Sequence, residues 1–487
     1  MCGCSGLTPS LYTFDLVLRL SCCLGRVNSY SSAFCFTSLL YSPCHFPGPG
    51  HRKQQHTLEE APSERLNLQS GMWQTRLFVI ALVSIQPGCV SGRFTFLRQM
   101  FNGVKVSSPS VADPGKPLFL TPYLERGEIE KARELSLVGP LEGPVVKSYS
   151  GFLTVNKTYN SNLFFWFFPA QTLPQSAPVL LWLQGGPGGS SLFGLFVEHG
   201  PYVVTKNRTL EARKVPWTSK YSMLYIDNPV GTGFSFTNHD EGYAQNEDDV
   251  GRDLYSALIQ FFQIFYEYQQ NDFYATGESY AGKYVPAIGY YIHVHNHIAK
   301  VKINFKGMAI GDGLSDPEVM LGGYAEFMYQ IGIIDEKQKQ YVQQQTDTGV
   351  RYIQQKKWRE AFEVFDTLLN GDTTEYPSFY KNVTGCTNYY NFLQCTEPLD
   401  QSYYGDYLSL PEVRNSIHVG NLTFHDGSEV EKHLLKDIMQ SVKPWVAILM
   451  NNYRVIIRGG GHILPYDQPE RAFDMIDRFI SRKGQFL

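Results

Sequence analysis

The chain has 487 residues, of which 43% are hydrophobic (14% aromatic) and 18% charged. This composition excludes a disordered or solvating protein and is sufficient for a large buried core. The net charge of −4 and the lack of a Lys/Arg run give no general attraction to nucleic acid or to an anionic membrane, so neither is expected as a partner.

The N-terminal part of the chain has the pattern of processing sequence. Residues 1–71 show no helical or strand period and hold six of the nine cysteines, so we interpret them as an extension ahead of a working initiator, Met72. Residues 72–92 contain one arginine, a short apolar run and then small residues, which is the order of a secretory signal peptide. The alternative is a buried strand or short helix. The run is too short to span a bilayer, so no membrane span is expected.

Strand-like and helical stretches alternate in residues 93–313, the first part of the predicted core. Five short apolar runs predict strands, and two segments with apolar residues at helical spacing predict helices. This alternation predicts an α/β fold with a largely parallel sheet that is covered by helices on both faces. The predicted strands span residues 149–156, 162–170, 177–184, 221–229 and 272–279, and the predicted helices span residues 246–265 and 281–295.

The composition changes after residue 313. Residues 314–442 are richer in Gln, Lys, Glu and Tyr and contain helical stretches, so we interpret them as a helical cap inserted into the core. Residues 443–487 return to a strand, a glycine loop and a final helix, which predicts the C-terminal part of the core.

Two further features agree with secretion. Cys386 and Cys395 lie close enough in the chain to close a small disulfide loop in an oxidising compartment, and two buried thiols are the alternative. Four tripeptides are acceptors for N-glycosylation, and they begin at Asn156, Asn207, Asn382 and Asn421.

A serine stands between two glycines in "GESYAG", residues 277–282, at the junction of a predicted strand and a predicted helix. This is the context of a nucleophile elbow, although the second glycine comes one place later than in Gly-x-Ser-x-Gly. The turn lifts the hydroxyl of Ser279 above the edge of the sheet, and the helix N-terminus stabilises developing negative charge. A simple helix cap is the alternative.

A histidine and a second glycine loop fit the same chemistry. His462 follows a predicted strand near the C-terminus, where the base stands in the chain order nucleophile, acid, histidine. The loop "GGPGG", residues 185–189, follows a buried strand and suits backbone N–H groups turned toward an oxyanion. It is not a phosphate loop, because no Gly-Lys-Ser/Thr follows. No metal is expected, because HExxH is absent and the histidines of residues 293–297 lack carboxylate support.

The stretches "WLQGGPGGSS", "DNPVGTGFS", "TGESYAGKYVP" and "GGGHILPYDQP" together resemble the serine carboxypeptidases. The resemblance covers residues 118–454 and 455–479. It implies an α/β-hydrolase fold with a helical cap, no cofactor, and removal of C-terminal residues from peptides in a lysosomal or other acidic compartment, or outside the cell. It also implies that Ser279 is the nucleophile and His462 the base.

The resemblance implies further site residues. The N–H groups of Gly186 and Tyr280 would form the oxyanion hole, and a four-residue set would hold the terminal carboxylate of the substrate. Two close carboxyls in that set cannot both ionise cheaply, so one stays protonated at low pH and can donate to that carboxylate. The glutamine departs from the family's usual asparagine. The set is Trp182, Gln184, Glu198 and Glu278.

The family's catalytic aspartate has no counterpart at its usual place. The family carries it between two strands, whereas here "NNYR" runs directly into "VIIRGGGH" at Arg454 and Val455. Roughly fifty or more residues are absent by that pattern, including one sheet strand. Asp467 follows His462 too closely to reach its outer ring nitrogen in the usual geometry. Asp312 and Asp437 precede the expected place and have no motif behind them.

The sequence therefore predicts a serine carboxypeptidase whose activity is impaired. The alternative is a catalytically silent variant, or pseudoenzyme, that binds peptides or a partner. An acyltransferase or esterase on the same scaffold is disfavoured, because the carboxylate-binding set is present.

Overall fold

The computed structural model describes residues 106–107, 113–144, 146–371, 373, 376–458 and 461–481. The predicted extension at residues 1–71 and the predicted signal peptide at residues 72–92 lie outside these ranges. None of the helices within them is long and apolar enough to cross a membrane.

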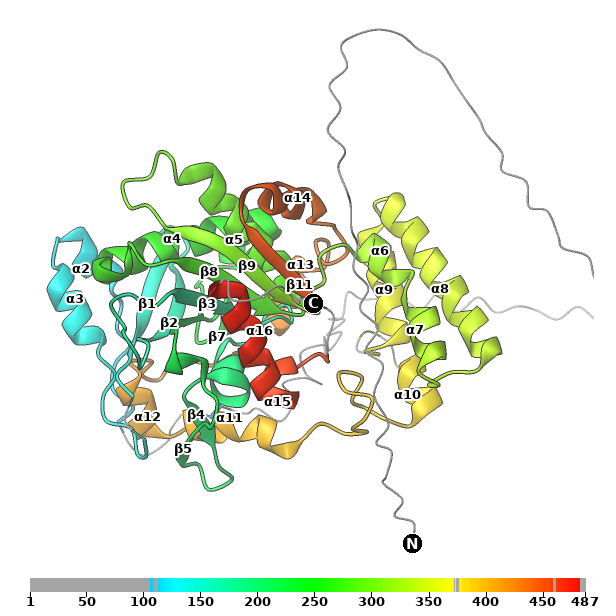
Figure 1. The fold of residues 1–487 in the computed structure, drawn as a ribbon, viewed down its shortest axis with the longest axis horizontal. Helices are drawn as coiled ribbons and strands as arrows, with labels where there is room; N and C mark the ends of the chain where they lie inside the picture. Colours follow the sequence, from blue (N-terminus) through cyan, green and yellow to red (C-terminus); the bar gives the residue numbers. More distant parts are fainter. Residues whose placement is uncertain are drawn as a thin grey trace, which may run out of the picture. The chain divides into compact units, whose positions relative to one another are not determined.

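A seven-stranded sheet forms the centre of the described structure, in the order β1-β2-β6-β3-β8-β9-β11 (Figure 1). β2 pairs antiparallel with β1 and with β6, and all the other neighbours are parallel. The mostly parallel sheet that the sequence predicts is confirmed. The strands are β1 (Tyr149–Asn156), β2 (Ser161–Phe168), β3 (Val179–Leu183), β6 (Ser222–Ile226), β8 (Phe273–Glu278), β9 (Phe305–Gly311) and β11 (Arg454–Arg458). Two short pairs form outside it, β4 (Tyr202–Val204) with β5 (Leu210–Ala212) and β7 (Thr232–Gly233) with β10 (His425–Asp426).

Both faces of this sheet are buried, because apolar side chains from successive residues point to opposite sides. In β3, Leu181 belongs to one core cluster and its neighbours Leu180 and Trp182 to the other. Helices cover each face (Figure 1). The first cluster includes side chains from α4 (Glu247–Ile264), α5 (Ala281–His295), α13 (Ser428–Leu434) and α14 (Lys443–Asn452), and α2 (Thr121–Glu125) and α3 (Ile129–Ser136) lie beside it. The second includes side chains from η1 (Gly194–His199), α11 (Tyr403–Leu408), α12 (Pro411–Ser416) and α16 (Pro469–Ser481).

Helix α4 shows why these segments fold as predicted. The side chain of Asn246 caps the helix by accepting from the N–H of Asp249. Three acidic residues in the first turn favour the positive end of the helix dipole. Val250, Leu254 and Leu258 then lie on one face at a spacing of four residues and are buried against the sheet.

The predicted cap does not pack as one unit. The helices between Tyr324 and Thr384 surround a small core of their own (Figure 1, yellow). Leu321, Ile353 and Phe362 nevertheless belong to the first cluster of the main core. From α11 onward, the chain packs into the main core instead, because Tyr404, Tyr407 and Leu408 are buried against the second face of the sheet. The range predicted for the cap, residues 314–442, stays a prediction. Its first five helices are α6 (Pro317–Leu321), α7 (Tyr324–Gln330), α8 (Glu336–Gln354), α9 (Trp358–Leu368) and α10 (Phe379–Thr384).

The junction between Arg454 and Val455 lies inside a single strand. Residues before the junction form α14, and the junction itself starts β11, which pairs in parallel with β9 from Arg454 opposite Gly307 to Arg458 opposite Gly311. β11 is the edge of the described sheet. The short α15 (Leu464–Asp467) and the 3-10 turns η2 (Trp217–Ser219), η3 (Asp240–Gly242), η4 (Tyr266–Tyr268) and η5 (Leu399–Ser402) complete the described elements.

Candidate active site

Ser279 stands at the tight turn that the sequence predicts. It has a φ of +60°, and it lies between the end of β8 and the start of α5. Its N–H donates to the carbonyl of Gly311 at 3.0 Å, and its own carbonyl accepts from the N–H of Leu314 at 2.9 Å. A residue other than glycine held at positive φ costs backbone energy, and such strain is concentrated at functional sites. The turn has the geometry of a nucleophile elbow.

The glycine loop approaches this turn closely. A Cβ atom on Gly185 would lie 2.6 Å from both the Cβ of Ser279 and the backbone nitrogen of Tyr280, so only glycine fits there. Gly186 has a φ of +122°, which also requires glycine. Gly186 and Tyr280 both line the cavity above Ser279. Their arrangement is compatible with the predicted oxyanion hole, which stays a prediction.

A buried aspartate holds the far end of this loop. The hydroxyl of Ser190 donates to Oδ1 of Asp227 at 2.6 Å, and the N–H of Ser191 donates to the same oxygen at 3.1 Å. The N–H of Phe234 donates to Oδ2 at 2.9 Å. Burial raises the pKa of Asp227 to about 7. The motif "DNPVGTGFS" therefore positions the loop around the nucleophile.

The predicted carboxylate-binding residues come together in one buried chain of contacts. The indole N–H of Trp182 donates to Oε1 of Gln184 at 2.9 Å, and Nε2 of Gln184 donates to Oε1 of Glu278 at 2.7 Å. Burial raises the pKa of Glu198 to about 8. Burial, reinforced by the charges of Glu198 and Asp312, raises the pKa of Glu278 well above its ordinary value. Both glutamates therefore keep their protons to a higher pH than an exposed glutamate does.

Arg213 holds the turn that carries Glu198 in place. Its guanidinium donates to the carbonyls of Phe196, Val197, Gly200 and Tyr202, at 2.5 to 3.2 Å. No sequence motif marks this arginine. Its partners are backbone carbonyls 11 to 17 residues earlier in the chain, and the chain must fold back to bring them to the guanidinium.

His462 lies beside an acid that sequence position alone did not suggest. Its Nδ1 is 2.7 Å from Oδ2 of Asp312, and the two side chains are 22% and 16% exposed. The atoms are close, but the N–H direction is not aligned with Oδ2, which has no hydrogen-bond partner of good geometry among the described residues. The signal for Asp312 was its place directly after β9, at the edge of the sheet where parallel strands present their carboxyl ends.

The other two aspartates that were considered are engaged elsewhere. Oδ1 of Asp467 accepts from Nδ2 of Asn391 at 3.2 Å. Asp437 forms a buried ion pair with Lys283 at 2.6 Å.

The cap contributes directly to the histidine. The predicted pairing of Cys386 with Cys395 is confirmed, with Cα atoms 4.6 Å apart. The loop that this disulfide closes carries Tyr390, whose ring centroid lies 4.3 Å from that of His462. The N–H of His462 donates to the carbonyl of Tyr390 at 3.4 Å. Sequence reasoning missed Tyr390, because the contact depends on how the cap folds over the core.

A cavity of about 530 Å³ joins these groups. Ser279, Asp312 and His462 line it on the core side, and the cap supplies a mainly apolar wall. Nε2 of His462 has no hydrogen-bond partner among the described residues, so the histidine and the serine face one cavity without bonding each other. The carboxylate-binding set does not line this cavity and lies beneath it, at 1% to 3% exposure. The apolar wall consists of Leu314, Met320, Tyr324, Phe327, Met328, Ile333, Phe362, Phe365, Leu369, Tyr380, Tyr389, Tyr390, Phe392 and Ile438.

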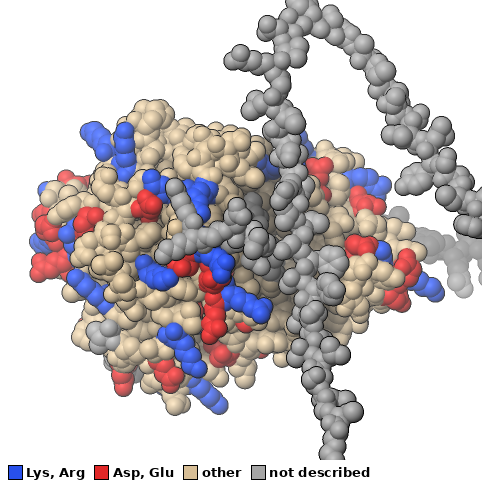
Figure 2. Space-filling view, in the orientation of Figure 1, with Lys and Arg blue, Asp and Glu red and all other residues tan. Residues whose placement is uncertain are grey.

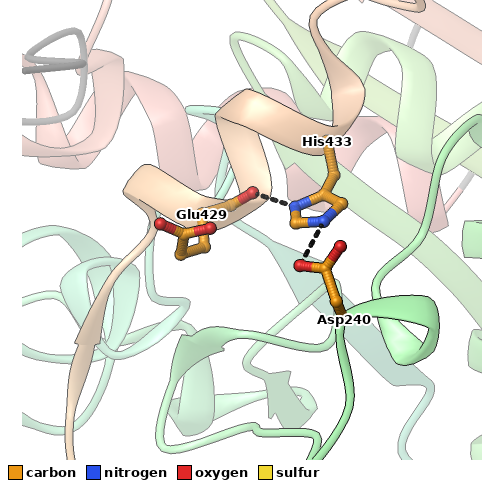
Figure 3. A group of neighbouring side chains, drawn as sticks. All are labelled: Asp240, Glu429 and His433. Atoms are coloured by element: carbon orange, nitrogen blue, oxygen red, sulfur yellow. Dashed lines mark hydrogen bonds and ion pairs between the residues drawn. The ribbon is translucent and has the colours of Figure 1, made fainter. Parts of the chain in front are cut away.

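Within the described residues, three side chains bring potential metal-ligand atoms within 4.8 Å of one another. They are Asp240, Glu429 and His433 (Figure 3). The ring of His433 is already engaged on both sides. Its Nδ1 is 2.7 Å from the carbonyl oxygen of Glu429, and its Nε2 is 3.0 Å from Oδ1 of Asp240. The ring also stacks on Tyr243 at 4.5 Å. The group therefore ties α13 to η3, and no ring nitrogen is left to bind a metal.

The surface carries charges of both signs. Lysines and arginines are interspersed with acidic residues over the face in Figure 2. Three of the predicted glycosylation asparagines, Asn207, Asn382 and Asn421, are exposed, and Asn156 is half-buried. Their modification stays a prediction.

Comparisons with known proteins show the family and the fold of this chain. The profile of the serine carboxypeptidase family matches residues 140–457. Probable serine carboxypeptidase CPVL of Homo sapiens is 58% identical, over 85% of this chain and 98% of that protein. Vitellogenic carboxypeptidase of Aedes aegypti is 40% identical, over 76% of this chain and 91% of that protein. The structure of Kex1(delta)p, a prohormone-processing carboxypeptidase from Saccharomyces cerevisiae, matches with a TM-score of 0.58 at 24% identity, over 71% of this chain and 82% of that one. The predicted α/β-hydrolase fold is confirmed.

The alignment with the human relative spans 474 positions but covers 85% of the 487 residues of this chain, which is about 414. About 60 of the aligned positions therefore have no residue in this chain. The family profile also ends at residue 457, close to the junction of Arg454 and Val455.

Proposed function

Because the chain belongs to the serine carboxypeptidase family, we propose that it removes C-terminal residues from peptides through an acyl-enzyme on Ser279, at a reduced rate. The observation that carries this proposal is the strained Ser279, which faces one cavity together with His462. In the proposed reaction, the hydroxyl of Ser279 attacks the last peptide carbonyl while Nε2 of His462 takes its proton. The N–H groups of Gly186 and Tyr280 receive the oxyanion.

His462 then gives its proton to the departing amino acid, and the acyl-enzyme remains. In the second step, His462 takes a proton from a water molecule that attacks the acyl-enzyme, and it returns this proton to Ser279 as the shortened peptide leaves. The pathway needs neither a metal nor a cofactor.

The reduced rate is supported by the junction at Arg454 and Val455. The family's acid belongs to a segment that would stand here, and the gap of about 60 positions in the human alignment supports its absence. Without the family's aspartate, the imidazolium that forms on His462 during attack is less stabilised than in a complete triad. A silent variant that only binds peptides is the alternative, and it differs in one observable: Ser279 would not react with a phosphonate.

An acidic compartment is supported by the buried carboxyls. Burial raises the pKa of Glu198 to about 8, of Asp227 to about 7 and of Asp253 to about 6. The folded protein therefore binds more protons than the unfolded chain between about pH 4 and these values, so its stability decreases as pH rises through that window. The predicted signal peptide, the glycosylation sites and the disulfide support passage through the secretory pathway, to a lysosomal or extracellular destination.

The predicted carboxylate-binding set should make the affinity for a peptide depend on pH, and this affinity can be measured without turnover. We expect a peptide with a free C-terminus to bind the Ser279→Ala variant about tenfold more weakly for each pH unit above about 8, the pKa of Glu198. Below that pH the glutamates are protonated and can donate to the substrate carboxylate, and above it one becomes an anion that repels the carboxylate. Calorimetric titration between about pH 5 and about pH 9 measures the dissociation constant.

The matched control is the same peptide with a C-terminal amide, whose binding should not change with pH in this way. Glu278→Gln should also weaken the dependence, since it removes one of the two coupled acids. An identical pH dependence for the free and the amidated peptide would show that this set does not bind the terminal carboxylate.

A further inference from the structure

The topology of the sheet brings Asp312 between the two reactive groups. β9 lies between β8 and β11, with Gly311 opposite Glu278 on one side and opposite Arg458 on the other. Ser279 follows β8, Asp312 follows β9, and His462 stands a few residues after β11. The nucleophile, an acid and the base thus leave the same edge of the sheet from three adjacent strands, because parallel strands present their carboxyl ends together.

The backbone of Asp312 is itself strained. Its φ is +35°, in the left-handed region that residues other than glycine rarely adopt. Aspartate and asparagine tolerate this region better than most residues do. The conformation turns the chain directly after β9, where the carboxylate lines the cavity beside His462.

The carboxylate of Asp312 faces the histidine with little competition. Oδ2 is 2.7 Å from Nδ1 of His462, and no other ion pair or hydrogen bond of this side chain is present among the residues that the structure describes. The nearby ionisable groups are the carboxyls of Glu198 and Glu278, whose pKa values are raised by burial. His462 is the basic side chain that lies against the carboxylate of Asp312. Catalytic hydrogen bonds are often poorly aligned without substrate, so the imperfect N–H direction does not exclude this role.

We propose that Asp312 acts as the positioning acid of His462 in this chain, in place of the aspartate of the absent segment. This inference rests on the proposed function. Asp312 accepts the Nδ1–H of His462 and fixes the tautomer in which Nε2 carries the free lone pair. The proton of Ser279 passes to Nε2, and Asp312 stabilises the imidazolium without taking a proton itself. The residual activity of the chain then depends on Asp312.

Asp312→Asn is the test, because asparagine keeps the shape and tolerates the positive φ. Asp467→Asn is the matched control, since Asp467 is close to His462 in the chain but is held by Asn391. We expect Asp312→Asn to lower the kcat for peptide hydrolysis, and the rate of phosphonate labelling of Ser279, by at least about 10², with KM unchanged. Asp467→Asn should leave both rates unchanged. Wild-type rates in a folded Asp312→Asn variant would overturn the inference.

A second readout separates this inference from the proposed function. The ¹⁵N chemical shifts of the His462 ring report its tautomer, whether or not the chain turns over peptide. We expect the Nδ1–H form to dominate in the wild-type chain and to lose its dominance in Asp312→Asn. If the tautomer shifts but no variant cleaves peptide, the proposed function fails and the positioning role stands. If the tautomer is the same in both, the positioning role fails, whatever the activity.

Discussion

Insertion of the family's segment between Arg454 and Val455 should raise peptide turnover by about 10² or more. In the proposed account, the segment would supply a second strand and the acid that orients His462, and a misplacement of the histidine of about 1 Å can alone cost about 10² in rate. The loss of a triad aspartate with geometry intact costs about 10⁴ in the chymotrypsin example, so the gain has room to be larger. The aligned residues of the human relative, about 60 positions, provide the segment.

The measurement is release of the C-terminal amino acid from a peptide at acid pH, by this chain and by the restored chain. Ser279→Ala in the restored chain should remove the activity. Asp312→Asn in the restored chain should have little effect, because the family's aspartate would then orient His462. Equal turnover by the two chains would show that the segment is not needed and that the junction does not limit the reaction.

The second large effect concerns stability. Lys283→Met should lower the free energy of unfolding by about 3–5 kcal/mol. The Nζ atom of Lys283 is fully buried and lies 2.6 Å from Oδ2 of Asp437. It also donates to the carbonyls of Asp437 and Ile438. Removal of the cation leaves the carboxylate of Asp437 buried without its ion-pair partner, 3.5 Å from the hydroxyl of Tyr280 and near the buried carboxyl of Glu247.

Urea denaturation of the single and double variants tests this expectation. Lys283→Met combined with Asp437→Asn should be less destabilised than Lys283→Met alone, because the double variant leaves no buried charge. Arg359→Met is the control for a surface pair, since Arg359 and Glu363 are mostly exposed and their ion pair should contribute little. If Lys283→Met is as stable as the wild-type chain, the buried pair does not anchor α5 to the segment before α14.

Much of the fold was predictable, because its signals are local. The boundaries predicted for residues 149–156 and 281–295 coincide with β1 and α5. The apolar run at residues 177–184 predicted a strand buried on both faces, and β3 is such a strand. The polar composition of residues 400–442 gave no sign that the aromatic side chains of α11 are buried.

In the candidate site too, the residues that belong to local motifs were predictable, and those whose contacts depend on the fold were not. Ser279, His462 and the loop that contains Gly186 belong to motifs within single segments, and the structure brings them to one cavity. Asp312 belongs to no such motif. Its contact with His462 depends on which strands lie side by side, because β11, which precedes His462, pairs with β9, which precedes Asp312. Tyr390 likewise depends on the folding of the cap over the core.

The most direct test of the central claim is labelling of this chain with a fluorophosphonate, followed by mass spectrometry of the labelled peptide. Ser279 lies in a strained turn above the sheet, and His462 faces the same cavity, so we expect slow labelling on Ser279 alone. Labelling should be lost in Ser279→Ala and strongly reduced in His462→Ala. Labelling that persists in a folded Ser279→Ala variant, or its complete absence from the folded wild-type chain, would contradict the assignment of Ser279 and His462 as nucleophile and base.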